Sequence, residues 1–397
     1  MSQAAPVIVV GAGIGGLTAA LLLARAGWPV TLIERRAALD EEGAGLQLSP
    51  NASRILIGMG LGEALERQAG SPARIRIRRG ADGGGIASVT LGVQALERYG
   101  APYFVAHRAD LAALLLDSVR AQARIRLVLG GEAGTVREHG DRLAVTVGCE
   151  AGDTIEGAVV IAASGLWSTF HFGRPFALRF CGYAAWRALI PVEAAPPFAC
   201  ADEVALWLAP NGHLVHYPIR GGKAVNIVAV LPEQRPSEGW SRPGDAQTIA
   251  QAIAGWADPA RDLIAAAQSW RCWSLFDRPP SPVWGAGRAT ALGDAAHPML
   301  PFLAQGASMA IEDAAVLAAK LLPSMGDAPE AIEAALRGYE QARRARTARA
   351  QRQARGNAIF YHAPRPLAFA RDIALSALSG QRLLARYDWL YGWRHEV

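Results

Sequence analysis

Cysteine and lysine are both scarce in this chain of 397 residues. The four cysteines lie far apart and form no C-x-x-C pair, so the sequence has neither the spacing of a disulfide framework nor that of a zinc site. Scarce, unpaired thiols are typical of proteins that stay in a reducing compartment. We therefore expect a cytoplasmic protein that holds no metal ion.

Only two of the 40 basic residues, Lys223 and Lys320, are lysines, so arginine carries nearly all the positive charge. The net charge of +5 is spread along the chain, which argues against nucleic acid as a partner. The densest basic run, residues 343–355, has helical spacing. We expect it to form a solvated helix face rather than a polyanion site.

Apolar runs long enough to suggest a membrane span are limited to residues 7–30. Glycines interrupt this run and no basic segment precedes it, so we expect neither a signal peptide nor a contact with a membrane. A strand, a glycine-rich turn and a helix explain the same residues better.

The first 34 residues contain the most specific motif of the chain. A β-branched segment, residues 7–10, leads into Gly11-x-Gly13-x-x-Gly16, a helical pattern follows, and a second strand ends at Glu34. The glycines allow a tight turn, close approach of a pyrophosphate and packing of the helix on the strand, and the carboxylate takes the hydroxyls of an adenosine ribose. The sequence therefore predicts a dinucleotide site. Because Glu34 disfavours the 2′-phosphate of NADP, the ligand is NAD or FAD.

A second unusual stretch, residues 291–321, reads ALGDAAHPMLPFLAQGASMAIEDAAVLAAKL. An apolar strand ends in Gly-Asp, a loop with Asp294 and His297 follows, and a helix begins with no bulky side chain in its first turn. Free N–H groups and the positive end of the helix dipole meet at such a start. The pattern therefore indicates the close approach of a flat or anionic group. No second dinucleotide fingerprint is present, so one dinucleotide is expected.

These two motifs and the segment HRADLAALLLDSV at 107–119 resemble the single-component FAD-dependent aromatic hydroxylases, and within that group the salicylate and 3-hydroxybenzoate hydroxylases. The resemblance covers nearly the whole chain, and GDAAHP is its most specific piece. It implies that the dinucleotide is FAD and that NADH or NADPH is the reductant. The residues that it places around FAD are Gly11, Gly13, Gly15, Gly16, Glu34, Arg35, Gln47, Arg108, Leu129, Asp294, Gly306 and Ala307.

By the same resemblance, Asp294 meets the ribityl and pyrophosphate part of FAD, and the helix that starts at Gly306 faces the pyrimidine edge of the isoalloxazine. Reduced flavin is anionic at that edge, which suits a helix N-terminus. Arg108 is expected at the phosphates or the ribityl chain, because a cation at a helix N-terminus is otherwise unfavourable. Gln47 is either a residue beside the flavin or an ordinary loop amide.

The resemblance also implies the chemistry: the family reduces FAD, adds O2 to form a flavin C4a-hydroperoxide and hydroxylates a small aromatic acid or phenol. A base near the phenol is needed, because a phenolate is far more reactive. In NGHLVHYPI (211–219), strand alternation puts His213 and Tyr217 on one face and His216 on the other. We expect His213, with a pKa near neutrality, to be the base and Tyr217 to orient the phenol; an aromatic core is the alternative. The expected pocket wall consists of Met299, Pro301 and Phe302, with His297 ordering their loop.

The fold class expected is α/β: a Rossmann-like FAD-binding domain with an inserted antiparallel-sheet substrate domain and a helical C-terminus. We assign residues 1–75, 101–180 and 271–325 to the FAD-binding domain. Residues 76–100 and 181–270 are assigned to the substrate domain, and 326–397 to the C-terminal region. Either a monomer or a homodimer is compatible with the sequence.

One segment departs from the family pattern. Where relatives carry Asp-Gly and a later arginine, IAASGLWSTFHF (161–172) has Ser164 and His171. The loss of this carboxylate and guanidinium predicts altered FAD binding or slow reduction by the nicotinamide. Two alternatives stay open: a halogenase or reductase on the same fold, and an FAD-binding protein without hydroxylase activity, to which Ser164 and His171 give weight. A halogenase needs a lysine beside the substrate, and neither lysine lies on a suitable segment.

Overall fold

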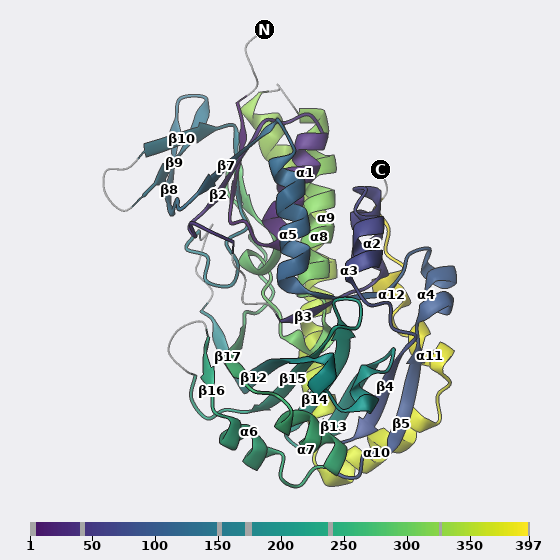
Figure 1. Cartoon of the computed structure of the whole chain (residues 1–397). Helices are drawn as coiled ribbons and strands as arrows, with labels where there is room; N and C mark the ends of the chain where they lie inside the picture. The colour runs from purple at the N-terminus through teal and green to yellow at the C-terminus, as the bar shows by residue number, and fades with distance from the viewer. Residues whose placement is uncertain are drawn as a thin grey trace.

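The computed structural model describes residues 5–39, 44–148, 153–170, 177–236, 241–324 and 328–395. Two parts lie one above the other, each built around one sheet (Figure 1). Helix α9 (Pro329–Tyr361) runs through both parts, because Leu336 packs in the core of the upper part and Ala354 in that of the lower part. The α/β architecture expected from the sequence is confirmed.

A five-stranded parallel sheet organises the upper part. Its strand order is β18 (Ala289–Ala291), β11 (Val159–Ala162), β1 (Val7–Val10), β2 (Val30–Glu34) and β7 (Ile125–Leu129), and every neighbouring pair is parallel. All residues of β1, β2, β11 and β18 are buried, as their continuous apolar runs predict for strands covered on both faces.

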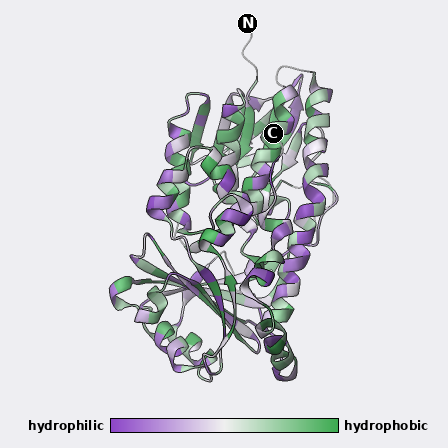
Figure 2. Ribbon diagram, turned by 90° about the vertical axis from the view of Figure 1, so that its right-hand side faces the viewer, coloured by the Kyte–Doolittle hydropathy of each residue, from purple (hydrophilic) through white to green (hydrophobic). Residues whose placement is uncertain are grey.

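Two different layers cover this sheet. Helices α1 (Ile14–Arg25), α5 (Arg108–Arg120) and α8 (Gly306–Leu321) form one core with the side chains of Val7, Val9 and Leu32. On the other face, an antiparallel meander of β8 (Ala133–His139), β9 (Arg142–Val147) and β10 (Asp153–Gly157) packs on the alternate side chains, such as Ile8 and Ile33. Figure 2 shows hydrophobic residues concentrated in the upper sheet and hydrophilic residues on the outer sides of its helices.

An eight-stranded sheet organises the lower part. Its order is β16 (Arg242–Gly244), β17 (Trp270–Asp277), β12 (Arg179–Pro191), β15 (Ala224–Pro232), β14 (Gly212–Ile219), β13 (Val204–Ala209), β4 (Arg74–Arg79) and β5 (Gly85–Thr90). All its pairs are antiparallel except β13 with β4. Strands from residues 74–90 thus extend a sheet formed mainly by residues 179–277, while the division into six sequence segments stays a prediction.

The two faces of the large sheet have different coverings. Helices α6 (Ala246–Ala252) and α7 (Asp258–Ala265) cover the outer face. The inner face carries Tyr217 and packs against the loop before α8, the end of α9 and the C-terminal helices α10 (Arg365–Ser376), α11 (Gly380–Ala385) and α12 (Asp388–Tyr391). The small sheet of β3 (Gly45–Leu48) and β6 (Phe104–His107) lies where the two parts meet (Figure 1).

Two helical stretches of the chain are each divided into two helices. Residues 51–69 contain α2 (Pro50–Gly58) and α3 (Gly62–Gln68), separated at Gly60, whose φ of +79° ends a helix. Residues 246–267 contain α6 and α7, with Pro259 in the first turn of the second helix. The remaining helix, α4 (Gly92–Tyr99), ends at Gly100 in the left-handed conformation.

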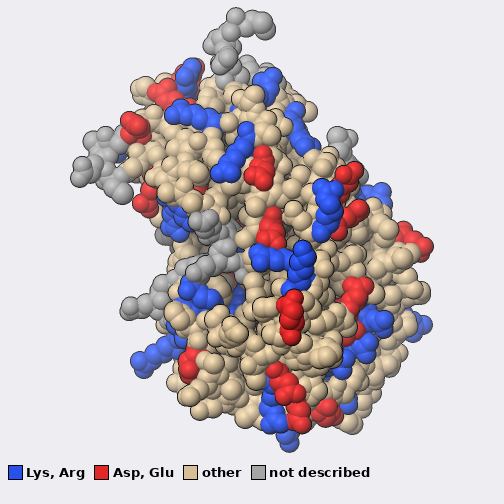
Figure 3. Space-filling model, viewed as in Figure 1, with Lys and Arg blue, Asp and Glu red and all other residues tan. Residues whose placement is uncertain are grey.

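Charged residues of both signs are interspersed over the face shown in Figure 3, so no field of one sign covers it. Within the described ranges, no helix has the length and hydropathy that a membrane crossing requires. The apolar run of residues 7–30 is instead β1, α1 and the start of β2.

Candidate active site

In the glycine-rich turn between β1 and α1, Gly11, Gly15 and Gly16 have no room for a side chain, whereas Gly13 faces open space. A Cβ on Gly11, whose φ is +105°, would lie 2.6 Å from the carbonyl oxygen of Ala163, and one on Gly16 would lie 1.8 Å from that of Gly11. A Cβ on Gly15 would meet Ala310 of α8 at 3.0 Å, so this glycine lets two helices pack. At Gly13, nothing lies within 4 Å. The backbone at Gly13, which caps α1, can therefore be approached closely by an anionic group.

Glu34, at the end of β2, lies against this turn. Its Oε2 accepts a hydrogen bond from the backbone N–H of Ala12 at 2.8 Å, and its Oε1 lies 2.9 Å from Nε of Arg36. Burial alone would raise the pKa of Glu34, but the bonds from Ala12 and Arg36 lower it, so the carboxylate is ionised. The neighbour that pairs with Glu34 is Arg36. Arg35, which the resemblance places around FAD, is exposed, and its contact with FAD stays a prediction. Leu129 of β7 lies directly beside Glu34 in the sheet.

The second site motif follows β18. Gly293 turns the chain with a φ of +61°, and its N–H donates to Asp313 at 3.0 Å. The side chain of Asp294 then points toward α8, since its Oδ1 lies 3.8 Å from where a Cβ on Gly306 would stand. Desolvation raises the pKa of Asp294, and the charges of His297 and Arg108 partly offset this. The fold thus brings Asp294, Arg108 and the first turn of α8 together.

The first turn of α8 is left without a side-chain cap. Gln305, the N-cap residue, makes no capping hydrogen bond, and the first turn contains no acidic residue. Its amide instead donates to Ser49 at 2.8 Å and accepts from Asn51 at 3.2 Å. The preceding Ala304 holds a left-handed φ of +53°, which directs the chain into the helix. The N–H groups at Gly306 and Ala307 are therefore positioned for an external acceptor.

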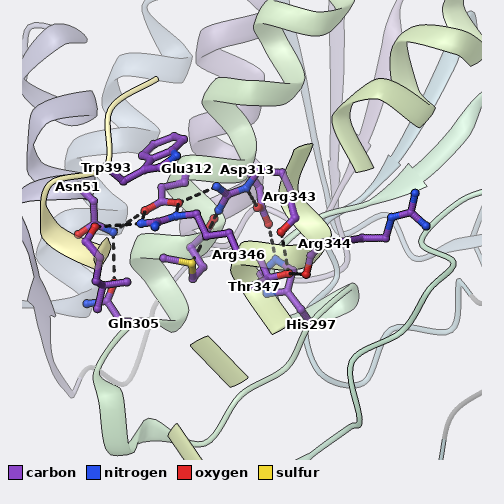
Figure 4. A network of polar contacts seen from close by, with 12 residues as sticks. Asn51, His297, Gln305, Glu312, Asp313, Arg343, Arg344, Arg346, Thr347 and Trp393 are labelled. Atoms are coloured by element: carbon purple, nitrogen blue, oxygen red, sulfur yellow. Dashed lines mark hydrogen bonds and ion pairs between the residues drawn. The ribbon is translucent and has the colours of Figure 1, made fainter. Parts of the chain in front are cut away.

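Two buried carboxylates of α8, Glu312 and Asp313, form ion pairs and hydrogen bonds that hold the start of this helix in place (Figure 4). Asp313 accepts hydrogen bonds from His297 Nε2 at 2.5 Å and from Arg343 Nε at 2.7 Å. Glu312 pairs with Arg343 and Arg346, each at 2.7 Å, and with Asn51 at 2.6 Å. Asp313 therefore holds the loop of residues 293–297, and His297 has the loop-ordering contact expected of it.

The same network corrects the prediction for residues 343–355. That run was expected to be a solvated helix face, but the Arg343 side chain is only 1% exposed and pairs with two carboxylates of α8. Arg355 forms a further ion pair with Asp277 of β17. The sequence of a helix does not distinguish an arginine that faces water from one that pairs with a buried carboxylate, because the carboxylate comes from a distant segment.

The inner face of the large sheet carries the two residues, His213 and Tyr217, that the sequence predicts to contact the substrate. His213 pairs across the sheet with Val230, and Tyr217 with Asn226, and both side chains are buried on this face. His216 faces the other side, where it contacts Phe198 and Trp207. The alternation predicted for residues 211–219 is therefore confirmed.

His213 lies beside the loop that leads into α8. Its ring centroid is 5.4 Å from that of Phe302, so the predicted base contacts the predicted pocket wall. The other two residues of that wall are close by: Met299 packs on the same core, and Pro301 precedes Phe302. The expected near-neutral pKa of His213 is wrong, because burial and the neighbouring His362 lower it well below 6.5. His213 is therefore a neutral imidazole at pH 7.

Tyr217 lies where the small sheet of β3 and β6 meets the large one. A Cβ on Gly45 would come within 2.7 Å of the Tyr217 hydroxyl, so β3 lies directly against it. Gln47 of β3 interacts with Tyr217 and accepts a hydrogen bond from Tyr103 at 2.5 Å. Burial raises the pKa of Tyr217. The hydroxyl therefore stays protonated and can donate a hydrogen bond.

Arg187 was missed by the sequence prediction. It pairs with Val228 of β15, which pairs with Val215 of β14, so Arg187 lies on the same face as His213 and Tyr217. Its guanidinium lies over Trp273 at 5.3 Å, and its Nε is buried with no hydrogen-bond partner among the described residues. Burial lowers the pKa of Arg187, which Tyr217 partly offsets. An arginine inside the apolar strand YAAWRALIPV was the available signal.

A parallel sheet with a glycine turn, a ribose-type carboxylate and an uncapped helix start defines a dinucleotide-binding flavoprotein fold, here joined to a second, mainly antiparallel sheet. A family model described as the FAD binding domain matches residues 4–354, and the chain belongs to this family.

Several known proteins are similar to this chain over nearly its full length. The chain is 40% identical over 393 residues to 3-amino-4-hydroxybenzoate 2-monooxygenase PtnB3 of Streptomyces platensis, covering 97% of this chain and 95% of that protein. It is 34% identical over 391 residues to 3-hydroxybenzoate 6-hydroxylase of Polaromonas naphthalenivorans, covering 98% and 96%. A salicylate hydroxylase substrate complex superposes with a TM-score of 0.83 at 26% identity, covering 99% and 97%.

The described residues fit FAD. The open side of Gly13 and the N-terminus of α1 suit a pyrophosphate, and the ionised Glu34 suits ribose hydroxyls. Asp294 and the uncapped start of α8 suit the ribityl chain and the pyrimidine edge of the flavin. The departure from the family pattern lies nearby: Ser164 donates to Ser168 at 2.7 Å, while His171 falls outside the described residues.

Replacement of Glu34 by alanine is expected to weaken FAD binding by about 1–3 kcal/mol, because ribose hydroxyls and the N–H of Ala12 lose their acceptor. Fluorescence titration of the apoprotein with FAD and with FMN measures this loss. FMN has no adenosine ribose, so its affinity should change much less. Equal weakening of FAD and FMN would show that Glu34 only supports the turn.

Proposed function

We propose that the protein is an FAD-dependent monooxygenase that hydroxylates a small aromatic acid or phenol with NADH or NADPH and O2. The observation that carries this proposal is the contact between His213 of the large sheet and Phe302 of the loop before α8. This contact supports a neutral imidazole close to the flavin ring, because Phe302 belongs to the loop that leads into α8. The hydroxylase relatives support the same reaction class.

The arrangement of the inner face suggests a role for each polar group. Arg187 is the cation that binds a carboxylate or phenolate, since its buried Nε lacks a partner in the described part of the chain. Tyr217, kept protonated by burial, donates to a substrate oxygen. His213 accepts the proton of the substrate hydroxyl, because its lowered pKa leaves it neutral.

Apolar groups complete the proposed site. Phe302, with Met299 beside it, excludes water from the side of α8, which favours an uncharged base and strengthens the contacts of Arg187. When bound and reduced, FAD supplies the activation of O2 and the oxygen atom transferred to the ring. The protein groups orient the ring, accept the proton and keep water away.

Oxidation of NADH and NADPH in air by the FAD-loaded protein tests the proposal. Hydroxybenzoates, aminohydroxybenzoates and hydroxynicotinates form the substrate panel, and ¹⁸O2 labels the product. We expect at least one acid to stimulate oxidation and to gain one ¹⁸O atom. If every compound gives only hydrogen peroxide or no stimulation, the alternative of an FAD-binding protein without hydroxylase activity holds.

The same assay tests the role of Arg187. In Arg187→Met, the KM for the best acid should rise about 10–100-fold, the range expected for one lost hydrogen bond to a charged group. The matching phenol without a carboxylate serves as the control and should show little change. An equal rise for both compounds would show that Arg187 does not bind the carboxylate.

A further inference from the structure

His213 forms a pair with a second buried histidine that no motif had indicated. Its Nδ1 lies 2.8 Å from Nε2 of His362, and the two rings stack at 5.1 Å and 28°. His362 is the C-cap residue of α9, 149 positions away in the sequence. This hydrogen bond therefore connects strand β14 to the C-terminal end of helix α9.

The surroundings of the pair keep both imidazoles neutral. Tyr183 of β12 packs at 4.5 Å from the His362 ring, Phe302 at 5.5 Å, and Tyr361 at 5.4 Å from His213. Among the described residues, Arg371 of α10 is the charged group that lowers the pKa of His362; it donates to the carbonyls of Phe360 and Tyr361 and pairs with Asp372. Burial, assisted by Arg371, lowers the pKa of His362 to about 4.

A hydrogen bond between two neutral imidazoles has a direction. If Nδ1 of His213 carries the proton, its Nε2 holds a lone pair and can accept a proton from the substrate. If His362 donates instead, Nε2 of His213 carries the hydrogen and cannot act as a base. The catalytic competence of His213 therefore depends on which ring donates.

The position of His362 favours the first direction. It caps the C-terminus of a 33-residue helix, where the helix dipole places partial negative charge, part of which Arg371 offsets by donating to the carbonyls of Phe360 and Tyr361. Nδ1 is the ring nitrogen closer to the backbone, and in His362 it is buried without a hydrogen-bond partner among the described residues. The negative end of the helix dipole favours the tautomer with the proton on Nδ1, and in that tautomer Nε2 of His362 is the acceptor.

We propose that His362 is a positioning residue: it accepts the Nδ1–H of His213 and so keeps Nε2 of His213 unprotonated toward the substrate. The inference rests on the proposed function for its catalytic meaning, but the tautomer can be measured without turnover. In the proposed step, the substrate O–H bond breaks, an N–H bond forms at Nε2, and the Nδ1–H stays on His213, bonded to His362.

Nitrogen-15 NMR of histidine-labelled, FAD-loaded protein at pH 7 tests the tautomer directly. In the natural protein, we expect a pyrrole-type Nδ1 and a pyridine-type Nε2 for His213, assigned by the signal lost in His213→Leu. His362→Leu should reverse or average this pattern, and His362→Gln should preserve it, because the glutamine oxygen can accept the same bond. A proton on Nε2 in the natural protein, or an unchanged pattern in His362→Leu, would overturn the inference.

Turnover supplies the second readout. His362→Leu should lower kcat for hydroxylation about 10–100-fold, the usual effect of losing a residue that orients a functional imidazole, with KM and FAD affinity unchanged. His362→Gln should stay within about threefold, and so should the control His216→Leu on the opposite face. Failure of the natural protein to hydroxylate any substrate would refute the proposed function, while the NMR result would still decide the tautomer.

Discussion

The His213→Leu variant is expected to hydroxylate its substrate about 10²–10⁴-fold more slowly than the natural protein, while its FAD spectrum and affinity stay unchanged. Leucine fills much of the ring volume between Phe302 and Tyr361 but cannot accept a proton. The substrate must then react as a neutral phenol or lose its proton to water that the apolar wall excludes. Single-turnover product formation, measured by rapid quench, gives the rate directly.

His216→Leu is the matched control for this variant. His216 is equally buried on the same strand, and neither of its ring nitrogens has a partner within the described residues, so its loss should leave the rate within about threefold. The pH profile adds an independent check. Because the pKa of His213 lies well below 6.5, the natural protein should not lose activity through this group as the pH falls from 8 to 6. A loss centred near pH 6.5, or equal rates for the two variants, would contradict the assigned role.

The Arg343→Met variant is expected to lower the free energy of unfolding by about 3–5 kcal/mol, the usual result of removing one partner of a buried ion pair. Methionine matches the length of the arginine stem, so packing is largely kept. Glu312 and Asp313 then stay buried and lose a cation 2.7 Å away. Denaturant unfolding at saturating FAD, followed by tryptophan fluorescence, measures the change.

Arg352→Met provides the control, because Arg352 is an exposed arginine on the same helix. It should change stability by no more than about 0.5 kcal/mol. Equal effects at positions 343 and 352 would mean that the buried network contributes nothing beyond ordinary surface charge.

The pH dependence of this effect follows from Asp313. Burial raises the pKa of Asp313, but His297 and Arg343 outweigh it and lower the pKa to about 2, below the ordinary 3.8. A carboxyl group whose pKa is lower in the folded state stabilises the fold above its ordinary pKa, and this stabilisation is lost as the pH falls toward 2. The difference between the natural protein and Arg343→Met should therefore narrow below about pH 4.

Short-range features of the site were predictable from the sequence because their physical causes are local. The order of strand, glycines, helix and Glu34 within 34 residues specifies a turn that only glycine can make and a carboxylate beside it. The alternation in residues 211–219 assigned His213 and His216 to opposite faces before any partner was known. The pairing of Glu34 with Arg36 was not predictable, because adjacent arginines differ only in the direction that the turn gives them, and the contact of Arg35 with FAD stays a prediction.

Sequence patterns could not predict the residues whose contacts come from distant segments of the chain. Arg187 reads as an interruption of an apolar strand until the neighbouring strands show which face it shares with Tyr217. His362 lies in no motif, and its contact with His213 closes a loop of 149 residues.

The sequence by itself determined the class of cofactor, the two segments that approach it and the strand that carries the proposed base, because spacing and backbone geometry act within a few residues. Only the tertiary structure shows which arginine of residues 343–355 is buried, that Arg187 shares a sheet face with His213, and that His362 contacts His213. Those assignments depend on which side chains from separate elements share a dry environment. Burial also moved the pKa of His213 away from neutrality.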